Sequence, residues 1–241
     1  LIPFHGKYSL CLSSQVGCAM KCSFCFTGTQ PLERNLKVEE IVGQYMQAAL
    51  WLRENRGDVE KILNLVFMGQ GEPLHNFDEV KKTCEILISQ HGASMGPKRI
   101  TVSTSGYLPG IERWISEMPK VNLALSLHSP FKDKRSELIP LNNKYPLEEV
   151  LYAIDKIELS KKQFVTFEYL VLDQFNDFEE DAHATAQLIK DRRPILNLIP
   201  FNPYPGAKYK RPSMERILKF KDIVESYKIP TMVRVTKGDQ D

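Results

Sequence analysis

Short runs of apolar residues alternate with longer amphipathic segments along almost the whole chain. The apolar runs are rich in Leu, Ile, Val and Phe, which is typical of strands, and they cover residues 9–14, 62–68, 99–104, 121–126, 164–172, 195–200 and 231–235. The segments between them repeat apolar residues at the helical period, and they cover residues 38–54, 77–91, 111–118, 147–159, 178–191 and 213–227. This alternation predicts βαβ units and a parallel sheet.

Two of the predicted helices begin with residues that favour a helix N-terminus. Asn76 precedes a segment that contains Glu79, and Ser213 precedes Glu215 and Arg216, the pattern expected at a helix start. The chain has no low-complexity stretch, no short repeat and no convincing linker. We therefore expect residues 1–241 to form one α/β domain, and a length of 241 residues suits one α/β barrel.

Small and polar residues follow each of the first six predicted strands. They occupy residues 18–25, 68–73, 103–106, 126–128, 172–177 and 200–206. Any one of these segments alone is typical of a turn or a helix cap. In α/β barrels, the carboxyl ends of the strands meet at one rim, and catalytic residues gather there. The six segments together therefore predict a functional site at that rim.

Three cysteines lie in the first of these segments, in the pattern Cys-X-X-X-Cys-X-X-Cys. They are Cys18, Cys22 and Cys25, and the aromatic Phe24 precedes the last of them. Three thiolates can bind three irons of a [4Fe–4S] cluster and leave the fourth iron without a protein ligand. An open coordination position distinguishes a reactive metal site from a closed structural one. The spacing therefore predicts a redox metal site with these three cysteines as ligands.

A structural zinc site is the main alternative for this segment. Cys22 and Cys25 alone would also suit a redox pair or half of a zinc knuckle. A structural zinc ion needs four ligands, normally in two pairs, and the remaining cysteines, Cys11 and Cys84, form no second pair. We interpret Cys84 as an inert core thiol, because it shares a predicted helix face with Leu87.

Composition and charge are those of a soluble protein from a reducing compartment. Thirty-two basic and thirty acidic side chains nearly cancel, so the net charge gives no sign of nucleic-acid binding. No apolar run approaches the roughly 20 residues of a membrane-spanning helix, and no signal peptide is visible. The five cysteines do not form a disulfide framework, so we expect a cytoplasmic location.

Basic residues form several short clusters, and we interpret most of them as solvated helix ends and loops. They lie at residues 98–99, 132–135, 161–162, 192–193 and 208–211. The last cluster follows a loop rich in proline and glycine and contains Tyr209. We therefore expect Lys208, Lys210 and Arg211 to contact the phosphates of a nucleic acid.

Other strand-end residues suit S-adenosylmethionine (SAM), which can bind an open iron through its amino and carboxylate groups. Gly71 lets the backbone approach a ligand closely, and Glu72 offers a carboxylate to the methionyl amine. Ser103 and Ser126 can bind ribose hydroxyls or the methionyl carboxylate, and Asn202 can read the edge of the adenine.

The motifs of the chain, taken in order, resemble the radical SAM methyltransferases that modify C2 of adenosine in 23S rRNA and some tRNAs. Besides the cysteine triad, they are Ser-Ser-Gln-Val-Gly-Cys at 13–18, Arg-Asn-Leu at 34–36, Met-Gly-Gln-Gly-Glu-Pro at 68–73, Ser-Thr-Ser-Gly at 103–106, Ser-Leu-His at 126–128 and Asn-Pro-Tyr-Pro-Gly at 202–206. The resemblance implies a radical SAM core, a partial (β/α) barrel of about six parallel strands. It also implies a [4Fe–4S] cluster and SAM as cofactors, with Leu127 and His128 beside Ser126 in the SAM site.

Partners and further segments follow from the same resemblance. It implies 23S rRNA or tRNA as the substrate, an electron donor such as flavodoxin or ferredoxin, and a monomer that does not bind a membrane. A small RNA-binding domain is expected before Leu1. The cysteine that carries the methyl group is expected beyond Asp241, because the chain stops inside the motif that begins near Lys237.

The reaction that the resemblance implies uses two SAM molecules. One methylates a cysteine thiolate, and the other is cleaved to a 5′-deoxyadenosyl radical that removes a hydrogen from the S-methyl group. The carbon radical adds to C2 of adenine, and the protein–RNA thioether is resolved by loss of the C2 proton and formation of a transient disulfide. By its position, Cys11 corresponds to the resolving cysteine, although a strand cysteine is more often a small hydrophobic residue.

Three other functions remain open at this stage. A sibling family methylates C8 of the same ribosomal adenosine, although residues 104–106 and the loop at 202–206 resemble the C2 enzymes more. A radical SAM enzyme that acts on a peptide or protein would share the cysteine triad. A binding module that keeps a cluster or a zinc ion as structure is the third.

Overall fold

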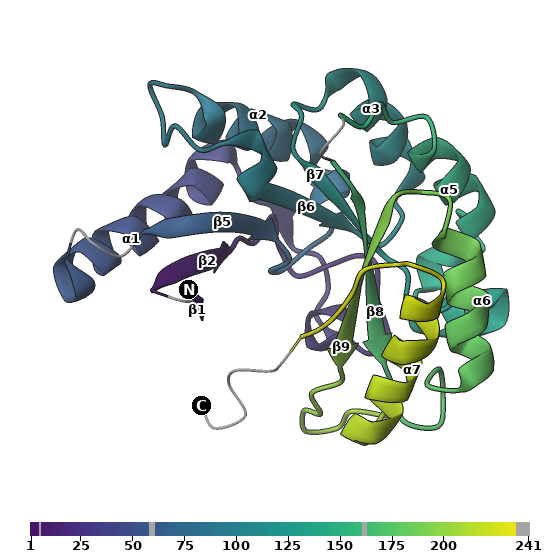
Figure 1. Ribbon diagram of the computed structural model, residues 1–241. Coiled ribbons are helices and arrows are strands. Elements are labelled where there is room, and N and C mark those ends of the chain that lie inside the picture. Colours follow the sequence, from purple (N-terminus) through teal and green to yellow (C-terminus); the bar gives the residue numbers. More distant parts are fainter. Residues whose placement is uncertain (5, 58–60, 161–162, 235–241) are drawn as a thin grey trace.

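The computed structural model describes residues 1–4, 6–57, 61–160 and 163–234. One sheet of eight strands has the order β1–β2–β5–β6–β7–β8–β9–β10. From β2 onward neighbouring strands are parallel, and β1 (Ile2–Phe4) lies antiparallel to β2 at the edge. The sheet curls into a half-barrel whose outer side is covered by helices (Figure 1). This confirms the predicted fold class, with one parallel strand more than expected.

Every predicted strand is present, with ends that differ by a few residues. The parallel strands are β2 (Lys7–Cys11), β5 (Ile62–Phe67), β6 (Ile100–Thr104), β7 (Asn122–Ser126), β8 (Val165–Val171), β9 (Pro194–Pro200) and β10 (Thr231–Val233). The predicted end of the last strand, residue 235, lies outside the described residues.

The six predicted helices are also present, in positions on the outside of the sheet (Figure 1). They are α1 (Val38–Arg56), α2 (Phe77–Ile88), α3 (Leu108–Glu117), α5 (Leu147–Ile154), α6 (Glu179–Ile189) and α7 (Met214–Ser226). In the part of the chain that the structure describes, no helix combines the length and the apolar character that a membrane crossing needs.

The two predicted helix starts have different outcomes. The Ser213 hydroxyl accepts a hydrogen bond from the backbone N–H of Arg216 at 3.3 Å and caps α7 as expected. The Asn76 side chain does not cap α2, because its amide donates to the carbonyls of Ser14 and Leu36 instead. Asn76 therefore ties α2 to the loop that follows β2.

Three elements were not predicted from the sequence. They are β1, the small hairpin of β3 (Gln15–Val16) with β4 (Arg34–Asn35), and the short helix α4 (Lys132–Leu138). The strands β1, β3 and β4 are too short to show an apolar period, and α4 is mostly charged and shows none either.

Side chains of each strand alternate between the helices and the inside of the half-barrel. In β8, Phe167 and Tyr169 belong to the main hydrophobic core under the helices. Glu168 and Leu170 point the other way and line a cavity inside the half-barrel. The inner face of the sheet therefore presents side chains to a ligand, while the outer face is packed.

Candidate functional site

A cavity of about 270 Å³ lies at the carboxyl ends of the parallel strands. Eight of the residues predicted for the site line it: Cys18, Cys22, Cys25, Gly71, Glu72, Ser103, Ser126 and His128. Four of the six strand-end segments therefore meet in one cavity. The segments at 172–177 and 200–206 do not contribute to its described lining.

The remaining predicted site residues lie outside this lining. Leu127 is fully buried, and its backbone N–H donates to the carbonyl of Glu168 at 2.9 Å. Asn202 is exposed on the loop after β9. Cys11 is half-buried at the end of β2, near the backbone of Met68, which lines the cavity.

The basic segment after β9 also lies outside the cavity. Lys208 and Lys210 are exposed and Arg211 is half-buried. Lys208 pairs with Glu137, so part of the predicted positive charge is balanced by a carboxylate.

The cysteine segment folds as a tight loop that requires a glycine close behind it. The backbone N–H of Cys25 donates to the Cys22 carbonyl at 3.1 Å, and that of Gly28 donates to the Cys25 carbonyl at 2.9 Å. A Cβ atom at Gly28 would lie 2.5 Å from the Cys22 carbonyl oxygen. Since real Cβ atoms do not come this close to an oxygen, a larger residue at position 28 would shift Cys22.

Contacts from three other parts of the chain fix this cysteine loop. The backbone N–H of Ser23 donates to the carbonyl of Leu138 at the end of α4, and the Ser23 hydroxyl hydrogen-bonds the Tyr209 hydroxyl at 2.9 Å. The Phe24 ring packs edge-on against His128 with 4.7 Å between centroids. The loop is thus held in place by protein contacts.

The three cysteines of the loop are the residues that could hold a [4Fe–4S] cluster. Cys18, Cys22 and Cys25 are half-buried, have free thiols and line the same cavity. Across the described residues, no three His, Cys, Asp or Glu side chains converge closely enough to hold one metal ion. In a cubane each thiolate binds a different iron, so one thiol for each of three irons is the arrangement that these residues could supply.

Burial disfavours the thiolate form of Cys18 and Cys22. It raises the pKa of Cys18 to about 11 and raises that of Cys22 further, and the neighbouring thiols add to the effect on Cys22. A metal that binds a thiol displaces its proton outright. Cys18 and Cys22 would therefore lose their protons only when a metal binds them.

Glu72 is buried and already hydrogen-bonded by the protein. One carboxylate oxygen accepts from the backbone N–H of Leu74, and the other accepts from the backbone N–H and the hydroxyl of Ser105 at 2.8 and 2.7 Å. The Gln15 side chain accepts from the Glu72 N–H at 2.8 Å. The carboxylate therefore joins the segments after β5 and β6, while Gln15 of β3 holds the Glu72 backbone.

The structure requires a glycine at position 71 because its backbone packs against Gln15. Its φ of +98° lies in the region that favours glycine, and a Cβ atom there would lie 2.5 Å from the Cβ of Gln15. A side chain at this position would push Gln15 away from Glu72.

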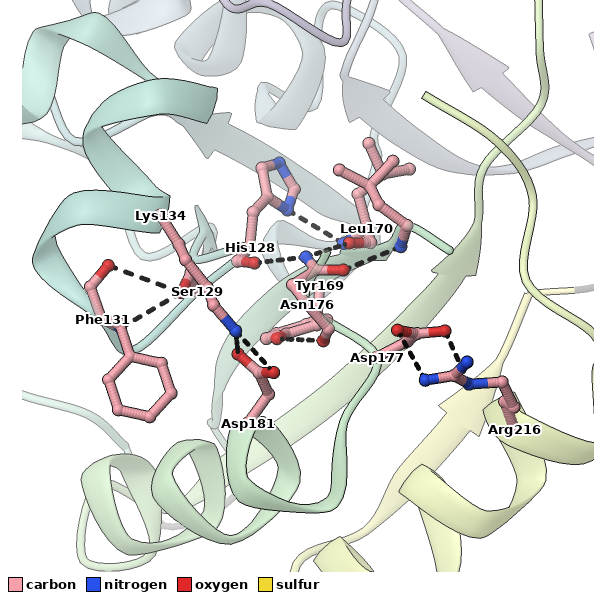
Figure 2. A network of polar contacts seen from close by, with 11 residues as sticks. His128, Ser129, Phe131, Lys134, Tyr169, Leu170, Asn176, Asp177, Asp181 and Arg216 are labelled. Atoms are coloured by element: carbon pink, nitrogen blue, oxygen red, sulfur yellow. Dashed lines mark hydrogen bonds and ion pairs between the residues drawn. The ribbon is translucent and has the colours of Figure 1, made fainter. Parts of the chain in front are cut away.

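His128 is held by a network that links β7 to the loop after β8. Its Nδ1 accepts from the backbone N–H of Leu170 at 3.0 Å, and the Asn176 amide donates to the carbonyls of His128 and Leu170 (Figure 2). Burial, aided by the nearby Arg135 charge, lowers the pKa of His128 to about 3. The imidazole is therefore neutral, and because Nδ1 accepts, Nε2 carries the proton.

Of the basic residues interpreted as solvated, Arg135 is buried and Lys134 is half-buried. Arg135 is 1% exposed and donates to the carbonyls of Leu127 and Ser105, which end two strands beside the site. Lys134 pairs with the buried Asp181 at 2.7 Å (Figure 2). The residue pair at 161–162 lies outside the described residues. The solvated interpretation was wrong for Arg135, because α4 turns it toward the protein, whereas Lys134 keeps part of its side chain exposed.

The cavity also contains residues that the sequence analysis missed. Glu168, Leu170, Ile199 and Arg234 line it from β8, β9 and the residue after β10. One signal was available: Glu168 is a single acidic residue inside an otherwise apolar strand segment, and such a residue in a buried strand is uncommon without a role.

Comparisons with known proteins agree with the chemistry of this cavity. The family model of the radical SAM superfamily matches residues 12–189. The crystal structure of a radical SAM methyltransferase from Sphaerobacter thermophilus is 41% identical, with a TM-score of 0.92, over 98% of this chain and 69% of that chain. Streptococcus suis SuiB bound to S-adenosylmethionine is 13% identical, with a TM-score of 0.66, over 94% of this chain and 50% of that chain, and shares the fold.

Proposed function

The chain belongs to the radical SAM superfamily, and from this premise we propose that it methylates C2 of an adenosine in 23S rRNA or tRNA. Its cofactors are a [4Fe–4S] cluster and SAM. The observation that carries the proposal is 41% identity to a radical SAM methyltransferase over almost the whole chain. The ordered motifs at 68–73, 103–106, 126–128 and 202–206 support adenosine C2 as the target.

In this proposal, the residues of the cavity bind and orient the cofactors. When bound, the cluster supplies the electron that cleaves SAM. Cys18, Cys22 and Cys25 hold the cluster, and Glu72 accepts hydrogen bonds from the methionyl ammonium through lone pairs that its protein donors leave free. His128 presents a neutral N–H donor, so it orients a ligand without adding a charge.

The position of the basic segment supports an RNA substrate. The backbone N–H of Asp173 donates to the carbonyl of Lys210 at 3.0 Å, which places this segment beside the loop after β8. Tyr209 between the two lysines is buried, and its hydroxyl bonds Ser23 in the cysteine loop. Lys208 and Lys210 therefore lie on either side of Tyr209, which is hydrogen-bonded to the cysteine loop. An RNA strand that enters the cavity would pass these two lysines.

The test is an assay of the full-length protein under anaerobic conditions. The protein with its cluster is incubated with 23S rRNA fragments or tRNA, a reductant, and SAM that carries a trideuterated methyl group. We expect 2-methyladenosine with two deuterium atoms in the methyl group, because one hydrogen is removed before the carbon adds to adenine. Mass spectrometry of the digested RNA gives the result, and the Cys22→Ala variant is the control.

Two results would contradict the proposal. Detection of 8-methyladenosine would assign the activity of the sibling family. A protein with an intact cluster that cleaves SAM but methylates neither RNA would indicate a different substrate.

Loss of positive charge at Lys210 is expected to weaken RNA binding without affecting the cofactors. The Lys210→Met variant loses one phosphate contact, so the slope of log affinity against log salt should fall by about one counterion. Filter binding at several salt concentrations measures the slope. An unchanged slope would show that Lys210 does not contact phosphate.

Replacement of Glu72 is expected to weaken SAM binding without affecting RNA binding. Glu72→Gln removes the negative charge and places an amide against the Ser105 N–H, so SAM affinity should fall on the order of tenfold. Calorimetry with the cluster-loaded protein measures this affinity, and RNA binding and iron content should stay as in the wild type. Equal losses of RNA binding in the Glu72 and Lys210 variants would refute the separation of roles.

A further inference from the structure

Arg135 is a buried cation that has no acidic partner in contact with it. Its side chain is 1% exposed and extends from α4. The guanidinium donates to the carbonyls of Ser105 at 2.9 Å and Leu127 at 3.3 Å. Its Nε is buried without a hydrogen-bond partner, and it pairs with no carboxylate in the part of the chain that the structure describes.

A buried positive charge without a counter-charge is costly in free energy. The two carbonyls satisfy hydrogen bonds of Arg135 but carry no charge that would balance it. Glu148 is exposed on α5, and Glu72 is linked to the guanidinium through Ser105. Burial lowers the pKa of Arg135 to about 10, so the side chain keeps its charge at neutral pH. The protein therefore holds a fixed positive charge in its interior.

This charge lies behind the wall of the cavity. Ser105, whose carbonyl accepts from Arg135, lines the cavity. Leu127, the second acceptor, lies between Ser126 and His128, and both of these residues line the cavity. The guanidinium therefore bridges the segments that follow β6 and β7, at the rim where the cysteines also lie.

The helix that carries Arg135 also contacts the cysteine loop. The carbonyl of Leu138, at the end of α4, accepts from the backbone N–H of Ser23 at 3.0 Å. Cys22 packs against the small apolar cluster that contains Leu138. Burial raises the pKa of Cys22, and the Arg135 charge opposes this rise. Arg135 and Cys22 are therefore close enough for their charges to interact.

An anionic group in the cavity would balance this charge, and a [4Fe–4S] cluster with three cysteine ligands is such a group. Three thiolates outweigh the 2+ charge of the oxidised iron–sulfur core, so the cluster with its ligands is an anion. Reduction adds one more negative charge. A fixed cation nearby stabilises the more negative state, and the net charge around a cluster is one of the factors that set its reduction potential.

We propose that Arg135 is the counter-charge of the [4Fe–4S] cluster and raises its reduction potential. Arg135 acts through its charge alone: an external one-electron donor supplies the electron, and no bond forms or breaks at the guanidinium. The contacts with Ser105 and Leu127 hold the charge in position. This inference rests on the cluster as a cofactor and does not depend on the RNA substrate.

The experiment measures the reduction potential of the cluster-loaded full-length protein without SAM. The protein is poised at a series of potentials with redox mediators at neutral pH, and electron paramagnetic resonance measures the reduced cluster. For Arg135→Gln, we expect the ratio of reduced to oxidised cluster at a fixed potential to fall about tenfold, because two unit charges about 10 Å apart in a protein change an equilibrium by roughly this factor. A tenfold fall corresponds to a midpoint potential about 59 mV lower for a one-electron couple.

Two further variants separate the charge of Arg135 from its contacts. Arg135→Lys loses the planar guanidinium, as Arg135→Gln does, but keeps a positive charge beside an anion, so its potential should stay close to the wild-type value. Lys132→Met removes an exposed charge from the same helix. Water and salt screen that charge, so this variant should have the potential of the wild type.

Equal falls in Arg135→Gln and Arg135→Lys, or an unchanged potential in Arg135→Gln, would overturn the proposal. If Arg135→Gln does not retain a cluster, Arg135→Met fills the space with an apolar side chain and allows the same comparison. Loss of the cluster in both neutral variants, but not in Arg135→Lys, would show that the site needs the charge. Loss of the cluster in all three would assign Arg135 a structural role and would also overturn the proposal.

Discussion

Cys22→Ala is expected to lose almost all of its iron after anaerobic reconstitution. Cys18 and Cys25 would remain in the cavity, but two thiolates are too few to retain a cubane cluster. The same loss is expected for Cys18→Ala and for Cys25→Ala. Iron and sulfide per chain, together with the visible absorbance of the cluster, measure the effect.

Cys84→Ala provides the matched control for these variants. Cys84 is fully buried in α2, and burial raises the pKa of its thiol to about 12, so it is neither exposed nor ionised. We expect this variant, like Cys11→Ala, to keep the iron content of the wild type. Iron retained in Cys22→Ala would overturn the assignment of the triad.

The strands and most of the site could be predicted because both depend on local patterns. A parallel strand buried on its outer face needs a run of apolar residues, and the residues that follow it must lie at the carboxyl rim. From this reasoning, residues as distant in sequence as Cys22 and Ser126 were predicted to lie at one site, and both line the same cavity. It required no knowledge of how the side chains pack.

The sequence could not predict features that depend on packing between distant segments. Arg135 sits among other charged residues, as a solvated side chain does, and only the position of α4 turns it toward Ser105 and Leu127. Glu168 and Asn197 meet through the register of β8 with β9. The role of Glu72 as a link between loops depends on Ser105 and Gln15, which lie far from it in the chain.

The exposed position of Asn202 has a related cause. Proline residues on both sides of Tyr204 restrict the backbone of the loop after β9. The positions of these prolines in the sequence do not determine the direction in which the loop leaves the sheet. Its contact with adenine stays a prediction, whereas Leu170 and Ile199 already line the cavity from regular strands.

Cys11→Ala is expected to trap the protein on the proposed RNA substrate. The proposed reaction forms a thioether between RNA and the methyl-carrying cysteine, and release needs a second sulfur. Cys11 lies at the end of β2, near the backbone of the cavity residue Met68. Cys84 lies in the core under the helices and cannot take this role. The described residues contain no disulfide, so Cys11 is a free thiol. Burial raises the pKa of this thiol, which favours its neutral form.

In the full-length protein, Cys11→Ala should therefore bind SAM, keep its cluster and attack adenosine, but release almost no methylated RNA. A denaturing gel should show a protein band shifted by RNA and restored by ribonuclease. The double variant Cys11→Ala/Cys22→Ala should show no shift, because attachment requires the cluster, and Cys84→Ala should release product as the wild type does. Free 2-methyladenosine at the wild-type yield from Cys11→Ala would mean that another group resolves the thioether, and Cys11 would then be a packing residue of β2.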